Sequence, residues 1–171
     1  GGHIWIGGGS AATWNGLTTV GNGRVGNWGT NDQGIYIGTS TLTTGAGSMS
    51  IYGGSNYSGT TMGTNVGVWI APGTTLSTTS GQIDIKGDVQ GKYTSGYGVL
   101  IGGLNTTTGD VTVKSTTGAI NITGTGDDST GGGSSFRVAL FVYSLGAGDT
   151  TTIKSTSGAI TLNGGATFAA A

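Results

Sequence analysis

Short runs in which apolar and polar residues alternate recur along the chain. The clearest run has the pattern Gly-x-Ile-x-Ile-x-Gly and occupies residues 81–87, 118–124 and, with Leu at the second apolar position, 158–164. A weaker copy covers residues 47–53, so the opening glycines are 34, 37 and 40 residues apart. Because alternation places successive side chains on opposite faces of an extended backbone, each run predicts a β-strand with one buried face.

A second apolar element precedes each of these runs. It covers residues 34–38, 67–70, 98–102 and, in degenerate form, 138–142, with a first copy at 3–7. Each unit therefore reads as a strand, a Thr-rich turn, a second strand and a variable loop. The later two units gain a middle strand, at 110–114 and 151–154, and the loops are expected at 54–66, 88–97 and 125–137.

Such a repeat predicts an all-β solenoid, because one copy cannot bury its apolar face alone and stacked copies can. We expect a single solenoid segment over residues 1–171 with about five rungs and Gly-rich loops, the rungs lying near 1–33, 34–66, 67–97, 98–137 and 138–171. Equivalent residues then form ladders. One ladder joins Ile35, Val68 and Val99, and another joins Ile51, Ile85, Ile122 and Leu162. Glycines at both ends of each strand would allow corners with positive φ.

Composition supports an ordered chain of short strands. Of 171 residues, 39 are Gly and only 8% are charged, while the apolar 34% gathers in alternating runs that a disordered chain has no reason to keep. Net charge is −1 without a Lys/Arg cluster, so we expect neither nucleic-acid binding nor membrane insertion. Absence of Cys removes disulfides and thiol catalysis.

The ends of the chain suggest a piece of something longer. It opens at Gly1-Gly2 without an initiator Met and closes on three alanines without an evident cap. We therefore expect neighbouring repeats, or other copies placed end to end, to cover the ends of the solenoid.

At these repeats the sequence resembles the giant repetitive adhesins of the filamentous-haemagglutinin type. The pattern at 155–164 is similar to the rung that those proteins repeat, and the stretch from His3 to Gly23 is similar to a module of giant surface proteins from gliding, surface-colonising bacteria. The resemblance implies a right-handed parallel β-helix, secretion to the bacterial cell surface, and a structural and adhesive role in attachment or motility. It brings no catalytic residue.

The residues themselves offer little chemistry for catalysis. His3 is the only histidine, so neither a His-based metal cluster nor a His-dependent triad can form within the chain. Asp127 and Asp128 could ligate Ca²⁺, but a solvated turn is the favoured interpretation. Asp110 and Asp149, each following a Gly, suggest turn-forming hydrogen bonds. We predict a non-enzymatic protein that needs no cofactor or metal.

Two surface hypotheses stay open. Trp14 and Trp28, in Gly/Asn-rich loops, are candidates for stacking on sugar rings in a lectin-like carbohydrate-binding module, which is the alternative function. Thr runs such as 74–79 could form hydroxyl arrays similar to those of ice-binding solenoids. Their expected place in turns, and the lack of a regular Thr-x-Thr at each rung, favour plain turn and ladder stabilisation.

Overall fold

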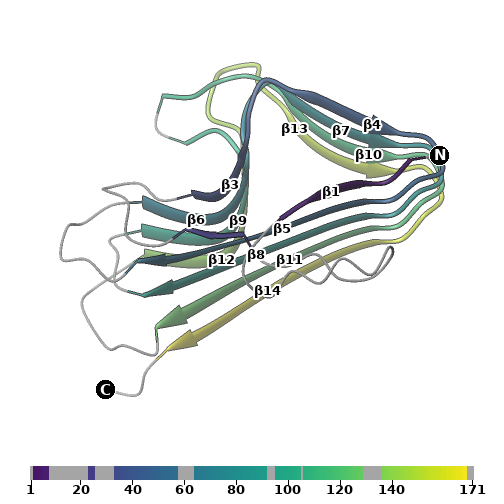
Figure 1. Cartoon of the computed structure of the whole chain (residues 1–171). Helices are drawn as coiled ribbons and strands as arrows, with labels where there is room; N and C mark the ends of the chain where they lie inside the picture. Colours follow the sequence, from purple (N-terminus) through teal and green to yellow (C-terminus); the bar gives the residue numbers. More distant parts are fainter. Residues whose placement is uncertain are drawn as a thin grey trace.

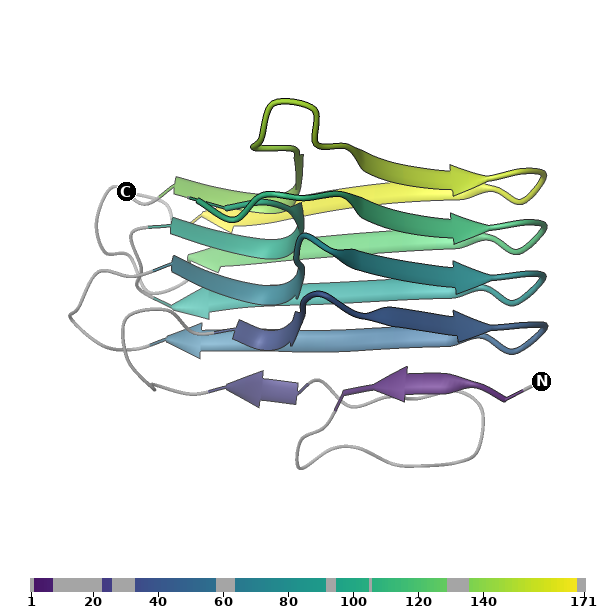
Figure 2. The same ribbon diagram turned by 90° about the horizontal axis from the view of Figure 1, so that it is seen from above.

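The computed structural model is an all-β molecule of parallel strands wound as a right-handed β-helix (Figures 1 and 2). It describes residues 2–7, 23–25, 33–57, 64–91, 95–104, 106–128 and 136–168. Within these residues there is no helix long and apolar enough to cross a membrane. Four complete rungs follow one another, preceded by two short strands that pair only with the first complete rung.

The strands belong to three sheets, named here A, B and C. Each rung contributes one strand to sheet B, then one to sheet C, then a long one to sheet A. Sheet B contains β3 (Gln33–Ile37), β6 (Thr64–Ile70), β9 (Ser95–Gly102) and β12 (Phe136–Tyr143). Sheet C contains β4 (Thr41–Thr44), β7 (Thr74–Thr78), β10 (Val111–Ser115) and β13 (Thr151–Ser155). Sheet A contains β1 (Ile4–Ile6), β2 (Gly23–Val25), β5 (Met49–Tyr57), β8 (Ile83–Gly91), β11 (Ile120–Asp128) and β14 (Ile160–Phe168).

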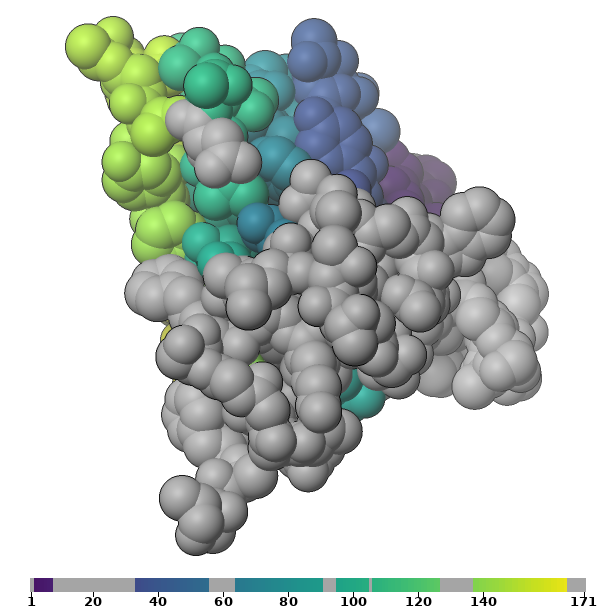
Figure 3. All heavy atoms as spheres, turned by 90° about the vertical axis from the view of Figure 1, so that its left-hand side faces the viewer, coloured from purple at the N-terminus to yellow at the C-terminus, as the bar shows by residue number. Residues whose placement is uncertain are grey.

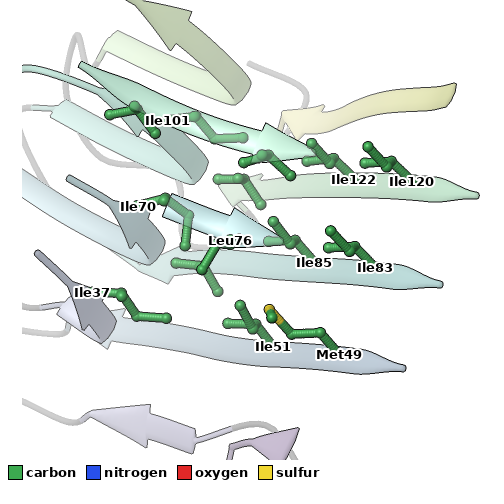
Figure 4. Packing of buried hydrophobic residues seen from close by; sticks show 14 of the residues in the cluster. Ile37, Met49, Ile51, Ile70, Leu76, Ile83, Ile85, Ile101, Ile120 and Ile122 are labelled. Atoms are coloured by element: carbon green, nitrogen blue, oxygen red, sulfur yellow. The ribbon is translucent and has the colours of Figure 1, made fainter. Parts of the chain in front are cut away.

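The main core lies between sheet C, the inner face of sheet B and the first half of sheet A (Figure 4). Register pairs Ile35 with Val68 and Val68 with Val99, the ladder expected from the repeat. In sheet A, the residues paired in sequence from rung to rung are Ile51, Ile85, Ile122 and Leu162. The apolar alternation of the repeat therefore becomes continuous ladders of side chains along the axis.

Every rung has a middle strand, contrary to the expectation that only the later two would. The segments predicted as Thr-rich turns form β4 and β7, where Leu42 and Leu76 point into the core and align with Val113. Threonine is β-branched and fits an extended backbone well, so one inward Leu between threonines is enough to place the segment in the sheet.

The expected loops are also too long, because the sheet A strands continue past the closing Gly of the repeat. β5, β8 and β11 end at residues 57, 91 and 128. Sheet B crosses over this second half of sheet A (Figure 1). The closing Gly therefore lies inside a strand.

Most repeat glycines serve close backbone contact and not positive φ. In sheet B, a Cβ added at Gly67 would lie 2.7 Å from the carbonyl oxygen of Asp88 in sheet A. In sheet A, a Cβ at Gly87 would overlap the carbonyl oxygen of Gly98 in sheet B. Equivalent positions of other rungs show the same crowding, at Gly34, Gly53, Gly98 and Gly124. Two columns of glycines thus let sheets A and B touch through their backbones.

Positive φ within the described residues is confined to the connection between sheets B and C. It occurs at Thr39, Gly73, Gly102, Gly109 and Gly148. Within the described residues, the turn from sheet C to sheet A does not use the positive φ that its glycines would allow, because it is built differently.

That turn rests on a column of buried or half-buried hydroxyls, each three residues before the opening Gly of the repeat. Thr78 Oγ1 donates to the carbonyl of Gly81 at 2.6 Å, and Ser115 Oγ accepts from the Gly118 N–H at 2.9 Å. Between rungs, Thr78 Oγ1 and Ser115 Oγ are 2.9 Å apart. Each hydroxyl thus satisfies polar groups that the turn would otherwise leave buried without a partner.

We predict opposite effects for two alanine substitutions on the same strand. In Gly124→Ala, the Cβ overlaps the Ala139 carbonyl oxygen, so we expect a loss of about 1–3 kcal/mol or more in the free energy of unfolding. In Gly126→Ala, the nearest atom is Val89 Cγ1 at 3.8 Å, so we expect no loss and up to about 1 kcal/mol of gain from reduced backbone entropy. Urea unfolding of both variants measures this. Equal losses would contradict the contact between the sheets.

Candidate functional site

The solenoid presents three outward faces of different chemistry. Alternation within each strand directs one set of side chains to the core and the other set outward. Because the strands pair in register, the outward side chains form columns that run from rung to rung.

The outer face of sheet A is polar, and its side chains bond largely to one another. Asp84 Oδ1 accepts from Asn121 Nδ2 at 2.9 Å, and Asp88 Oδ1 accepts from Thr125 Oγ1 at 2.9 Å. Lys86 Nζ lies 5.3 Å from the ring centroid of Tyr52. Burial and the nearby Asp84 carboxylate raise the pKa of the Tyr52 hydroxyl. Most of the hydrogen-bonding capacity of this face is therefore used within it.

A hollow lies on this face, lined by Lys86, Gly87, Asp88, Thr123 and Thr125. Both carboxylate oxygens of Asp88 already accept hydrogen bonds, Oδ2 from Gln90 Nε2 at 3.0 Å and Oδ1 from Thr125 Oγ1. Within the described residues there is no group of three or more His, Cys, Asp or Glu side chains that could hold a metal ion.

The outer face of sheet B is aromatic and partly buried. Tyr36, Trp69, Leu100 and Phe141 form one column. Tyr36 and Trp69 meet edge to face at 5.1 Å, and Trp69 Nε1 donates to the Gly102 carbonyl at 2.9 Å. Leu100 is fully buried in a second hydrophobic cluster. Figure 3 looks onto this flank. Part of this face is therefore packed in the second hydrophobic cluster, and part of it, including Tyr36, is exposed to solvent.

The outer face of sheet C is a regular array of hydroxyls, turned toward the reader in Figure 2. One column consists of Thr41, Thr75, Thr112 and Thr152, and the next consists of Thr43, Ser77, Lys114 and Lys154. All eight side chains are exposed or half-exposed. The threonine runs thus lie largely in a sheet and not in turns, as strands β4 and β7 show. A Thr-x-Thr pattern does not recur at every rung, because Ser77, Lys114 and Lys154 occupy the second column.

Two aspartates join neighbouring rungs at the connection between sheets B and C. Asp110 Oδ1 accepts from the Thr150 N–H at 2.7 Å and from Thr150 Oγ1 at 2.9 Å. Asp149 Oδ2 accepts from the Gly109 N–H at 2.7 Å and, within its own turn, from the Gly146 N–H at 3.0 Å. Both aspartates therefore bond across the rung interface, and Asp149 also bonds within its turn.

The remaining predicted site residues contribute little to a site. His3 Nδ1 accepts a hydrogen bond from the Ser48 N–H at 3.0 Å, which joins β1 to the next rung. Trp14 and Trp28 lie outside the described residues. Asp127 and Asp128 continue strand β11 in place of the expected loop, and their side chains lie outside the described part of the chain. The calcium and glycan hypotheses at these positions therefore stay predictions.

Comparison with protein-family models, curated proteins and solved structures gives no match.

Acid should remove the contribution of Asp110 to stability. Hydrogen bonds from the backbone and side chain of Thr150 lower the pKa of this carboxyl. A lowered folded-state pKa means that the contribution is complete above the unfolded pKa of about 3.9 and is lost as the pH falls through the folded value. We expect Asp110→Asn to lower the melting temperature above about pH 5, with the difference from the parent shrinking toward pH 2. A difference that stays constant over this range in thermal unfolding would contradict the assignment.

Proposed function

We propose that this chain is a structural and adhesive segment of a filament exported to the bacterial cell surface, where it forms part of a rigid, non-enzymatic shaft. The observation that carries the proposal is the repetition of one rung. Four rungs share the same three-sheet register, so the same arrangement of three strands repeats along the axis and the body can be lengthened by adding copies. The resemblance of the repeat to filamentous-haemagglutinin-type adhesins supports the same role.

The shaft has a clear mechanical basis. Backbone hydrogen bonds between rungs run along the axis in all three sheets. The glycine columns bring sheets A and B into direct backbone contact where they cross. The long strands β5, β8 and β11 end on the flank where β6, β9 and β12 begin (Figure 1). The chain therefore passes from one rung to the next on the same flank in each complete rung.

The last rung supports continuation of the stack. Ile160 and Leu162 are 43% and 49% exposed, whereas Ile120 and Ile122, their partners in the preceding rung, are fully buried. The backbone edges of β12, β13 and β14 have no further strand beside them in the described part of the chain. A neighbouring repeat or another copy placed end to end would cover this surface.

Antibodies against residues 1–171 test the cellular role. We expect immunogold labelling of intact producing cells to mark surface filaments, and cryo-electron microscopy of those filaments to show rungs about 4.8 Å apart. Deleting the gene should reduce attachment to solid surfaces. Labelling confined to the cell interior, or a labelled particle that is discrete and globular, would overturn the proposal.

The exposed rung should also mediate weak end-to-end association of the isolated chain. We expect sedimentation velocity to show concentration-dependent growth of the parent chain and none for Ile160→Lys/Leu162→Lys. The melting temperature should change little, because both side chains are already exposed.

Thr161→Lys/Asn163→Lys is the matched control. It places the same charge on the same strand, but on outward positions. We expect this variant to associate like the parent. Loss of association in both variants, or a parent chain that stays monomeric at high concentration, would contradict a role for the apolar edge.

A further inference from the structure

The outer face of sheet C carries two lysines in an unusual position. Lys114 and Lys154 pair in register on the neighbouring strands β10 and β13, so their backbones are about 4.8 Å apart. Both side chains are exposed, and neither forms an ion pair within the described part of the chain. Like charges directly opposite one another destabilise a sheet. The chain has only six Lys and Arg residues, and two of them share this place.

The neighbouring column supplies hydroxyls suited to a ligand. Thr112 and Thr152 precede the two lysines by two residues and therefore point to the same side of the sheet. Within the described residues, the outward hydroxyls of this column form no hydrogen bond. Threonine loses little side-chain freedom on binding because its χ1 angle is already restricted. The column is thus a rigid row of free donors and acceptors.

The polar side chains on the outer face of sheet A, in contrast, are bonded to one another. There, the carboxylates bond to Asn121, Gln90 and Thr125, and Lys86 lies over Tyr52. On sheet C, charge and hydroxyls are left open side by side. A free face of this kind is suited to a ligand that carries both negative groups and hydroxyls.

We propose that the outer face of sheet C binds an anionic polysaccharide. Lys114 and Lys154 bind its carboxylate or sulfate groups, and the threonine column forms hydrogen bonds with its hydroxyls. Two lysines are fewer than the clusters of about 4–8 basic residues that bind an anionic membrane. They are also fewer than the roughly 6–10 phosphate contacts that a nucleic-acid-binding protein makes. The columns of this face also contain no aromatic residue, so base stacking has no platform on them.

Binding by one segment is expected to be weak, because two exposed lysines contribute modestly. Repetition of the segment along a filament would raise the effective affinity through multivalency. The inference therefore deepens the proposed adhesive role, on which its biological meaning rests, by assigning a ligand class to one face.

Retention of the isolated chain on immobilised polymers tests the inference. The probes are polygalacturonate, which carries carboxylates, dextran sulfate, which carries sulfates, and neutral dextran. We expect retention on one or both anionic polymers and none on dextran, with binding weakening about tenfold between 50 and 200 mM salt. The two anionic arms show which group the lysines prefer. Equal retention on dextran, or no retention on any polymer at low salt, would overturn the proposal.

Charge-neutral variants locate the surface. Lys114→Gln/Lys154→Gln should weaken retention at least fivefold, while its melting temperature stays equal to or above that of the parent because the like-charge repulsion is removed. Lys86→Gln, on the outer face of sheet A, is the matched control and should bind like the parent. If Lys86→Gln loses as much retention as the double variant, net charge and not this face is responsible.

A shape-conserving variant tests the hydroxyl column. Thr112→Val/Thr152→Val removes two outward hydroxyls and keeps β-branched side chains, so the sheet should keep its stability. We expect about threefold or greater loss of retention on polygalacturonate at low salt. Unchanged retention would limit the site to the lysines and overturn the role of the threonines. Loss of the predicted polysaccharide binding would not change the outcome of the cell-labelling experiment. The ligand proposal and the filament proposal can therefore fail independently.

Discussion

The backbone contact between sheets A and B is the constraint on which the rest of the structure depends. Gly67 and Gly98 of sheet B approach the main chain of sheet A so closely that no side chain fits between them. Because the two sheets cross at this contact, the first half of each sheet A strand is left free to face sheet C. The main core occupies the space that results. Side chains in place of these glycines would push the two sheets apart in each rung where the contact recurs, at Gly34, Gly67 and Gly98.

The apolar ladders could be predicted from the sequence, and the glycine contacts could not. Alternation around Ile85 and Ile122 identifies strand, face and register together, because a shift of one residue would expose every apolar side chain. A glycine in a strand pattern has several explanations, namely a corner, a bulge or a close approach. Only the crossing of sheet B shows that Gly87 and Gly124 belong to the last of these. The strands β4 and β7 were missed because a single inward Leu gives too short a pattern to separate a strand from a turn.

The candidate surfaces were harder to predict because their residues act through columns and not through local motifs. Thr75 and Thr112 are 37 residues apart, and nothing between them in the sequence indicates that they are neighbours. Their hydroxyls become an array only once the sheet C register is known. In the same sheet, Thr78 and Ser115 turn inward and hold the turns. Hydroxyl side chains thus have two roles in this sheet. Because alternate residues of a strand point to opposite faces, those directed inward stabilise the turns and those directed outward form the array.

The last rung shows how strongly each rung relies on its neighbours. Ala139 takes the place that Gly34, Gly67 and Gly98 hold in sheet B. A Cβ added at Gly164, opposite it, would lie 3.4 Å from the Ala139 Cβ, which is van der Waals contact without overlap. An inner rung is stabilised by interfaces on both sides, whereas this rung has one within the described chain, so Leu162 remains half-exposed although it continues the ladder of Ile122. The apolar area left open there is stabilising only when covered, at about 25 cal/mol per Å². A further rung in the same register would gain this energy through the same kind of interface, which already occurs three times between the complete rungs.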